Sequence, residues 1–181
     1  ALYHAQAIHW LESYGVAPGI ANIQYRLGYN SSAMCFFALF SMRWLTGQSF
    51  HVCNGFILLF SILLAVKNIF RGFHKEDLMS NLCSIGTLIC CSILIYNAVS
   101  PTSDILPMVT VLWIVMEWTL LIEKKEENVC PYALLCIAGL FSFSGKVSMA
   151  MIVLLTIRPL ITLIKERRIK EILIYTGMGI F

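Results

Sequence analysis

The stretch Ser142-Phe143-Ser144-Gly145-Lys146 interrupts an apolar run that extends from residue 132 to residue 164. As one helix, this run of roughly 33 residues would be about 50 Å long, whereas the hydrocarbon core of a bilayer is about 30 Å thick. A lysine on an isolated helix costs several kcal/mol at the bilayer centre. The run is therefore predicted to form two helices, about 131–144 and 147–164, joined by a turn that places Lys146 at one membrane face.

The composition of the whole 181-residue chain is that of a membrane protein. Hydrophobic residues make up 59% and charged residues 13%, and the mean hydropathy is +0.79. Soluble domains carry roughly a quarter charged residues. A disordered tail, an ordinary cytosolic enzyme and a nucleic-acid-binding module are excluded, and the predicted fold class is all-α, a polytopic transmembrane helical bundle.

The positions of the basic residues predict the sidedness of this bundle. Three further apolar segments, 52–70, 79–99 and 104–122, have about the 20 residues that a span needs, and another begins at residue 172. Lysines and arginines cluster at 67–77, 123–130 and 165–171, which the positive-inside rule assigns to the cytoplasm. The loop 100–103 carries neither lysine nor arginine, so this loop and the Lys146 turn are predicted to lie outside.

Residues 1–50 are predicted to form a large extracytoplasmic loop that precedes the transmembrane part, 51–181. It has the apolar patterns of two juxtamembrane or interfacial helices, about 2–14 and 31–46, and Arg43 interrupts the second. Tyr3, Ala7, Trp10, Leu11 and Tyr14 form a heptad-like face in the first helix, which is expected to lie on the membrane. Because Ala1 already stands within a helical pattern, the sequence is expected to be a piece of a longer chain.

The sequence gives little sign of a metal centre. Most of the seven cysteines lie in or beside apolar segments, where a thiol behaves as a small hydrophobe, and no zinc-type spacing occurs. His4 and His9 are five residues apart, which turns them away from each other by roughly 140° on a helix. No set of metal ligands is predicted, and the one kind of ligand that the sequence offers a divalent metal is a carboxylate such as Asp104.

The predicted outer face collects polar residues that would suit a site at headgroup depth. Irregular backbone at membrane depth is tolerated where it is buried in protein or lines a water-filled cavity. Arg26 and Lys146 would together suit a phosphate or pyrophosphate, and Asp104 could serve as general base, metal ligand or partner of a cation. The candidate site residues are Tyr3, His4, Arg26, Asn30, Asp104 and Lys146.

Several short motifs resemble a family of bacterial polytopic proteins that look related to the GT-C glycosyltransferases. These are Leu2-Tyr3-His4-Ala5-Gln6-Ala7-Ile8-His9-Trp10, Tyr14-Gly15-Val16-Ala17-Pro18-Gly19 and Arg26-Leu27-Gly28-Tyr29-Asn30-Ser31-Ser32, all in the predicted first outer loop. Ser100-Pro101-Thr102-Ser103-Asp104 resembles the Thr-Pro-Asp turn of mannosyl- and arabinosyltransferase-like members. Gly145-Lys146-Val147-Ser148-Met149-Ala150 resembles their Thr-Lys-x-Ser/Thr-Ala-Leu turn, with glycine in place of threonine.

The resemblance implies a fragment from the N-terminal half of a multi-pass protein of the bacterial cytoplasmic membrane. Its reaction would be sugar transfer from a polyprenyl-phosphate or polyprenyl-pyrophosphate donor at the outer face, in cell-envelope glycan assembly. Lys146, Arg26 and Asn30 would bind donor, Tyr3 and His4 would position donor or acceptor, and Asp104 would orient a cation or an acceptor hydroxyl. The family's Asp-x-x-Leu-Tyr-His pattern would place the catalytic carboxylate upstream of Ala1.

Simpler roles remain open for each candidate. Lys146 could be a snorkelling anchor, Asp104 a helix N-cap, and the histidines polar-face residues of a surface helix. Arg26 could form an ion pair with Glu12 and have no further role, and Arg43 is interpreted as an interfacial anchor beside Trp44. The alternative function is a non-catalytic membrane component: a transporter, a flippase or a polysaccharide polymerase-like protein. Besides the polyprenyl-linked donor, the expected partner is membrane lipid, and no nucleic acid is expected.

Overall fold

The computed structural model describes residues 2–16, 18–23, 25, 31–72, 78–126, 128–165, 170 and 172–173. Within these ranges the chain is helical without any strand, as predicted. The elements are, in order, α1 (Leu2–Tyr14), α2 (Ile20–Ile23), α3 (Ser32–Leu39), α4 (Arg43–Thr46), α5 (Cys53–Gly72), α6 (Leu78–Leu94), the 3₁₀ helix η2 (Ile95–Asn97), α7 (Ile105–Glu123), α8 (Val129–Gly145), the 3₁₀ helix η3 (Val147–Thr156) and α9 (Ile157–Lys165).

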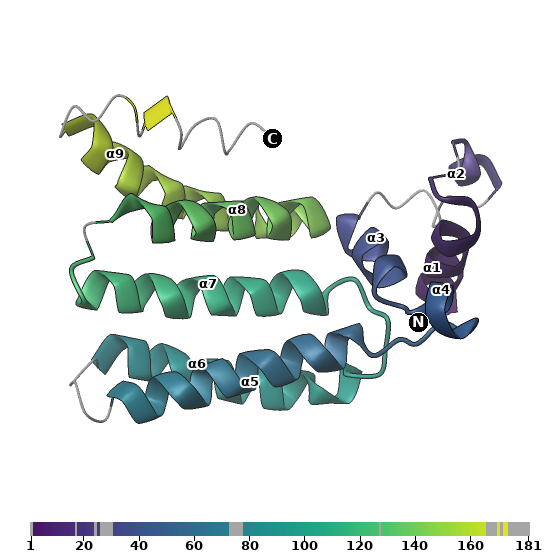
Figure 1. The fold of residues 1–181 in the computed structure, drawn as a ribbon, viewed down its shortest axis with the longest axis horizontal. Coiled ribbons are helices and arrows are strands. Elements are labelled where there is room, and N and C mark those ends of the chain that lie inside the picture. Colours follow the sequence, from purple (N-terminus) through teal and green to yellow (C-terminus); the bar gives the residue numbers. More distant parts are fainter. Residues whose placement is uncertain are drawn as a thin grey trace.

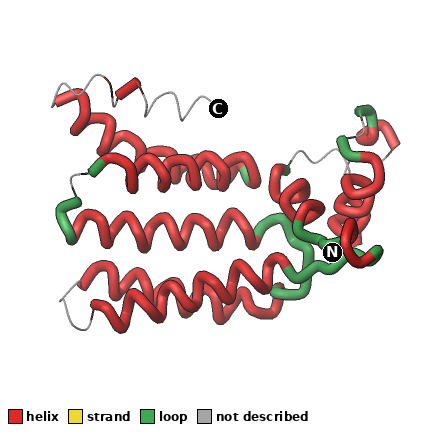
Figure 2. The backbone as a smooth tube through the Cα atoms, viewed as in Figure 1, coloured by secondary structure: helices red, strands yellow, loops and turns green. Residues whose placement is uncertain are grey.

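The long helices lie side by side, and the four N-terminal helices gather at one end of them (Figure 1). We call this the α3 end, because α3 packs there against α8. The loop that joins α4 to α5 and the loop that joins η2 to α7 also lie at the α3 end (Figure 2). A site built there can draw side chains from segments far apart in the sequence.

Three of the described helices are long and apolar enough to cross a membrane: Cys53–Arg71, Leu78–Asn97 and Ile105–Glu123. Large apolar side chains point outward from α5 and α6, including Phe60 at 63% and Ile93 at 73% exposure. Contiguous exposed apolar surface of this kind suits a lipid environment and not water. The sequence predicts five spans, but α8, with 17 residues, and the segment η3–α9 are not among these three.

Prolines mark where three of these helices start. Pro107, Pro131 and Pro159 are each the third residue of their helix, in α7, α8 and α9. A backbone N–H in the first turn has no partner within its own helix, so proline loses nothing there, whereas farther along it would break the helix. The proline spacing therefore agrees with separate helices beginning at residues 105, 129 and 157.

The chain turns between α8 and η3 at Lys146, where the sequence predicts a turn. The next segment differs from the α-helix expected over 147–164, because its first ten residues form the 3₁₀ helix η3. A 3₁₀ helix rises about 2.0 Å per residue against 1.5 Å for an α-helix. The segment η3–α9 therefore covers a greater length than the same residues in α form.

The helix expected over 31–46 is two helices, α3 and α4. The break falls at Met42, whose φ of 58° is left-handed. The Ser41 hydroxyl donates to the Ala38 carbonyl at 2.9 Å, taking up a carbonyl at the end of α3. Because the helix breaks at Met42, Arg43 stands at the start of α4, and its side chain contacts Glu12 of α1.

The face of α1 that packs against the protein is centred on Ile8, and the contact of the heptad-like face with the membrane stays a prediction. Ile8 is fully buried. Four residues before it, His4 is 8% exposed, and four residues after it, the side chain of Glu12 is 3% exposed. Tyr14, which the heptad-like face includes, is 70% exposed. This stripe faces inward because α1 packs against α3.

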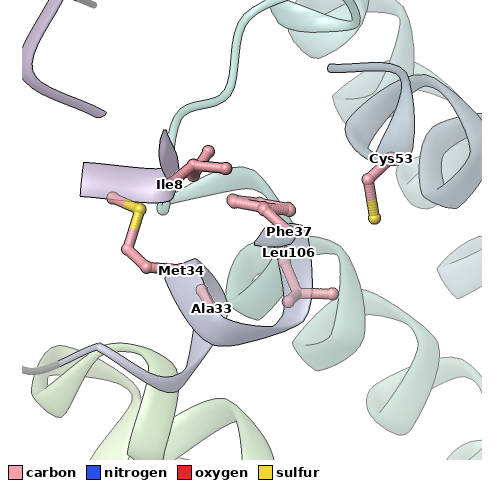
Figure 3. Packing of buried hydrophobic residues seen from close by; sticks show 6 residues of the cluster. All are labelled: Ile8, Ala33, Met34, Phe37, Cys53 and Leu106. Carbon is pink, nitrogen blue, oxygen red and sulfur yellow. The ribbon is translucent and has the colours of Figure 1, made fainter. Parts of the chain in front are cut away.

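A small apolar core holds the N-terminal helices to the bundle. One cluster contains Ile8 of α1, Ala33, Met34 and Phe37 of α3, Cys53 at the start of α5 and Leu106 at the start of α7 (Figure 3). At the other end of the bundle, Glu123 accepts hydrogen bonds from the backbone N–H groups of Met79 at 2.6 Å and Ser80 at 3.1 Å. A carboxylate is favourable at the N-terminus of α6, where backbone N–H groups lack partners.

Candidate functional site

Hydrogen bonds join the end of α8 to the start of α3. The Ser31 hydroxyl donates to the Gly145 carbonyl at 2.7 Å, and the Ser32 and Ser144 hydroxyls are 2.8 Å apart. A Cβ on Gly145 would lie 3.0 Å from Pro107 Cγ of α7 and 3.9 Å from Ala33 Cβ. Glycine thus lets α3, α7 and α8 approach closely, and the residue that follows, Lys146, emerges at this junction.

Lys146 forms an ion pair with Asp104. Its Nζ lies 2.9 Å from Asp104 Oδ1, and the two side chains are 30% and 53% exposed. Asp104 stands at the N-cap position of α7, but its side chain makes no capping hydrogen bond. Asp104 is thus the N-cap residue of α7, as the simpler alternative expects, but its carboxylate contacts Lys146 and does not make a capping hydrogen bond.

Asn54 holds the loop that leads into Asp104. Its Nδ2 donates to the carbonyls of Ser100 at 2.7 Å and Thr102 at 3.1 Å, and Asn54 is 1% exposed. Two polar atoms at this contact, Asn54 Oδ1 and Thr102 Oγ1, are buried without a hydrogen-bond partner in the described part of the chain. The loop is thus fixed from α5 while it keeps unused hydrogen-bonding capacity.

His4 and Tyr3 enter from the start of α1. Their ring centroids are 3.9 Å apart, and His4 Nδ1 is buried without a hydrogen-bond partner among the described residues. Burial lowers the pKa of His4 below its usual 6.5, while the Asp104 carboxylate acts in the opposite direction. His4 is therefore a neutral imidazole at pH 7, within the electrostatic reach of the Asp104–Lys146 pair.

The structure thus brings together four of the six predicted site residues at the α3 end: Tyr3, His4, Asp104 and Lys146. Arg26 and Asn30 lie outside the described residues.

A second polar cluster joins α1 to α4. Arg43 Nη1 lies 3.2 Å from Glu12 Oε2, 2.9 Å from His9 Nδ1 and 3.0 Å from Ser13 Oγ, and the Ser49 hydroxyl donates to Glu12 Oε2 at 2.6 Å. An arginine can only donate, so His9 Nδ1 accepts and the imidazole proton sits on Nε2. The sequence offers Arg26, which lies outside the described residues, as a partner of Glu12. The partner that the structure gives is Arg43, which the sequence marks as an interfacial anchor.

The environment of Glu12 keeps it charged. Burial raises its pKa, but polar contacts with Ser41 and Ser49 and the hydrogen bond and charge of Arg43 outweigh that effect and hold the pKa below 4.5. Glu12 and Arg43 also line a cavity of about 760 Å³ between α1, α3 and α4. An acidic residue on the same stripe as Ile8 was the sequence signal for this cluster.

No three histidine, cysteine, aspartate or glutamate side chains gather closely enough to hold a metal ion in the described ranges. The one carboxylate considered as a metal ligand, Asp104, has a lysine as its neighbour.

Comparison with known proteins gives a family but no activity. A family model described as "Domain of unknown function (DUF8201)" matches residues 1–181. No curated protein and no solved structure matches the chain.

Proposed function

For a chain that belongs to the DUF8201 family, we propose a function in membrane glycan assembly: it takes part in sugar transfer from a polyprenyl-phosphate or polyprenyl-pyrophosphate donor at the α3 end, in the manner of a GT-C glycosyltransferase. The observation that carries the proposal is the Asp104–Lys146 pair, 2.9 Å across, beside the buried His4. It joins a cation, a carboxylate and a neutral imidazole at the end of apolar helices.

The partly exposed ion pair is suited to exchange with an anionic ligand. Exposed pairs contribute about 0–1 kcal/mol, so little is lost when the cation turns to a stronger partner. An ammonium has three N–H donors, and a phosphate oxygen is a strong acceptor for them. Lys146 would bind donor phosphate and stabilise the charge that grows on it as the sugar C1–O bond breaks.

Release of Lys146 would leave Asp104 as a hydrogen-bond acceptor. A sugar acceptor attacks through a hydroxyl oxygen, whose proton must pass to a base, and Asp104 is 53% exposed for that role. His4 is too buried to meet a ligand with more than an edge of its ring, so it would position Asp104 or the acceptor. Tyr3, stacked on His4, would keep that imidazole in place.

The proposed location is a bacterial cytoplasmic membrane, with the α3 end at its outer face. The segments α8 and η3–α9 would then be two additional spans, in agreement with the basic residues near 124 and 165. In the 3₁₀ form, η3 adds roughly 20 Å over its ten residues and α9 roughly 13 Å. Together they match a hydrocarbon core of about 30 Å.

The alternative function, a transporter or flippase, agrees less well with the position of this site. Transporters bind their substrates near the bilayer midplane, on broken helices of repeated halves. The Asp104–Lys146 pair instead lies at the ends of α7 and α8. That placement supports chemistry at headgroup depth.

The test is binding of undecaprenyl phosphate to the protein in lipid nanodiscs, measured by native mass spectrometry. Lys146→Met keeps the length of the side chain and removes its charge, so binding should fall about tenfold or more. The matched control is Lys124→Met, an exposed lysine at the opposite end of α7, which should leave binding unchanged. Equal affinity of folded Lys146→Met and wild-type protein would refute the phosphate role.

An assay of sugar transfer from a polyprenyl-phosphate-linked sugar by the full-length protein would then test whether the protein is an enzyme. Asp104→Asn should abolish transfer while phosphate binding persists. Transfer at the wild-type rate would exclude Asp104 as the base.

A further inference from the structure

The cavity between α1, α3 and α4 is separate from the Asp104–Lys146 site. Its volume of about 760 Å³ falls within the range of small-molecule sites. Glu12 lies eight residues after His4, about 12 Å farther along α1. Both residues belong to the buried stripe of α1, so the helix separates two polar sites on one side of the protein.

The charges of this cavity cancel within the protein. Glu12, whose side chain is 3% exposed, pairs with Arg43 at 3.2 Å, and Arg43 also donates to His9 and Ser13. An anionic ligand would compete with Glu12 for one guanidinium. The cavity is therefore suited to an uncharged ligand.

One buried acceptor in the cavity wall is unused. Glu12 Oε2 accepts from Arg43 and Ser49, whereas Oε1 is buried and has no hydrogen-bond partner among the described residues. Because Oε1 is closed off from the cavity, the polar groups that a ligand can reach are the guanidinium of Arg43, which is 34% exposed, and the exposed Ser13. An uncharged ligand with hydroxyls matches these groups, and an aliphatic chain does not.

An aromatic surface stands at the rim of the same cavity. Trp44 lines it and is 75% exposed, on the short helix α4. Left-handed Met42 and Gly47 bound this helix, and Arg43 ties it to α1. Trp44 is thus a flat apolar surface held next to polar groups, an arrangement that suits a ring with apolar C–H groups on its face and hydroxyls on its edge.

We propose that this cavity binds a neutral pyranose carbohydrate, stacked on Trp44 with hydroxyls reaching the partly exposed Arg43 and Ser13. That this sugar is the glycan acceptor rests on the proposed function. The carbohydrate site itself does not.

The test is saturation-transfer-difference NMR on the full chain in lipid nanodiscs, since maltoside detergents would themselves occupy a sugar site. The probes are methyl α-glucoside, methyl β-galactoside, maltose and, as the charged comparison, glucuronate. We expect signals from at least one neutral probe and a weaker signal from glucuronate, because its carboxylate would have to compete with Glu12 for the Arg43 guanidinium. Silence from all three neutral probes overturns the proposal, and so does an equal or stronger glucuronate signal.

Two variants assign the site. Trp44→Ala alters an exposed side chain, so the protein should fold, and sugar affinity should fall about tenfold. The control is Leu45→Ala, 68% exposed and not a lining residue, which should bind as wild type. Equal affinity of wild type and Trp44→Ala would place the sugar elsewhere and overturn the proposal.

The two proposals fail separately. Lys146→Met should retain saccharide binding while it loses undecaprenyl phosphate, and Trp44→Ala should do the reverse. Loss of both ligands in both variants would contradict two separate sites.

Discussion

At the residue scale, Gly145 links the helix packing to the candidate site. Pro107 and Ala33 occupy the space that a side chain would need at this position. Glycine here is therefore a consequence of the close packing between α3, α7 and α8. This packing leaves the position of Lys146 dependent on a residue with no side chain.

Gly145→Ala should lower the free energy of unfolding by about 1 kcal/mol, because the new Cβ would approach Pro107 Cγ to 3.0 Å. Gly86→Ala, the control, places a Cβ inside α6 with nothing within 4 Å and should stabilise by up to about 1 kcal/mol. Denaturant titration of both variants in mixed micelles measures the difference. A Gly145→Ala protein as stable as Gly86→Ala would mean that the helices are less closely packed here.

His4 should make stability depend on pH. Its pKa is lowered on folding from 6.5, so the unfolded chain binds a proton first as the pH falls below 6.5. The stabilisation due to the neutral imidazole is complete above pH 6.5 and decreases below it, towards the folded pKa. His4→Gln should make the melting temperature depend less on pH than in wild type between pH 6.5 and pH 5. Parallel pH profiles for wild type and His4→Gln would show that His4 titrates freely.

At the element scale, the sequence predicts the long helices better than the short ones. Length and apolar runs define α5, α6 and α7, because a span has a fixed minimum length. The turn at Lys146 follows from the cost of a charge in lipid. In contrast, the face of α1 that is buried depends on α3, a partner whose position no local pattern in α1 encodes.

The same distinction holds for the candidate site. Charge placement predicts that Asp104 and Lys146 share one end of the bundle, but their 2.9 Å contact requires the register of α7 against α8. Arg43 reads as an interfacial anchor because its neighbours in sequence are apolar and aromatic. Its actual side-chain partners, His9, Glu12 and Ser13, come from α1, and only the tertiary arrangement joins them.

The Glu12–Arg43 pair should couple α1 to α4. Arg43→Gln leaves a buried carboxylate without its cation and should destabilise by about 2 kcal/mol, less than a fully buried pair because Arg43 is 34% exposed. It should also raise the pKa of Glu12, because the charge that lowers it is lost. Glu12→Gln in the same protein should recover much of the stability. A double-mutant cycle measured by thermal unfolding checks this, and additive single effects would show that the pair is not coupled.

At the scale of the whole molecule, the polar contacts of both candidate sites lie at the α3 end. The Asp104–Lys146 pair, the loop held by Asn54 and the Arg43 cluster all belong to it. The opposite end carries the exposed Lys124 and Lys125. Such an asymmetric bundle is expected of a protein that acts on one face of a membrane.

Cysteine labelling can test this orientation and the number of spans together. In a background with the exposed Cys35 and Cys130 replaced by serine, single cysteines would be placed at Val99, Val147 and Lys124. Val99 and Val147 are 80% and 73% exposed at the α3 end, and Lys124 is exposed at the other. A membrane-impermeant maleimide applied to intact cells should label positions 99 and 147 and leave 124 unlabelled until the membrane is opened.

The labelling result at position 147 decides the role of the shortest helices. If α8 and η3–α9 cross the bilayer, residue 147 shares its side with residue 99, because Lys146 pairs with Asp104 just after that loop. If α8 instead lay flat against the cytoplasmic face, residue 147 would be labelled together with residue 124. In that case Lys146 could meet Asp104 only by leaving the membrane surface on which its own helix rests, and the site at the α3 end would lose its cation.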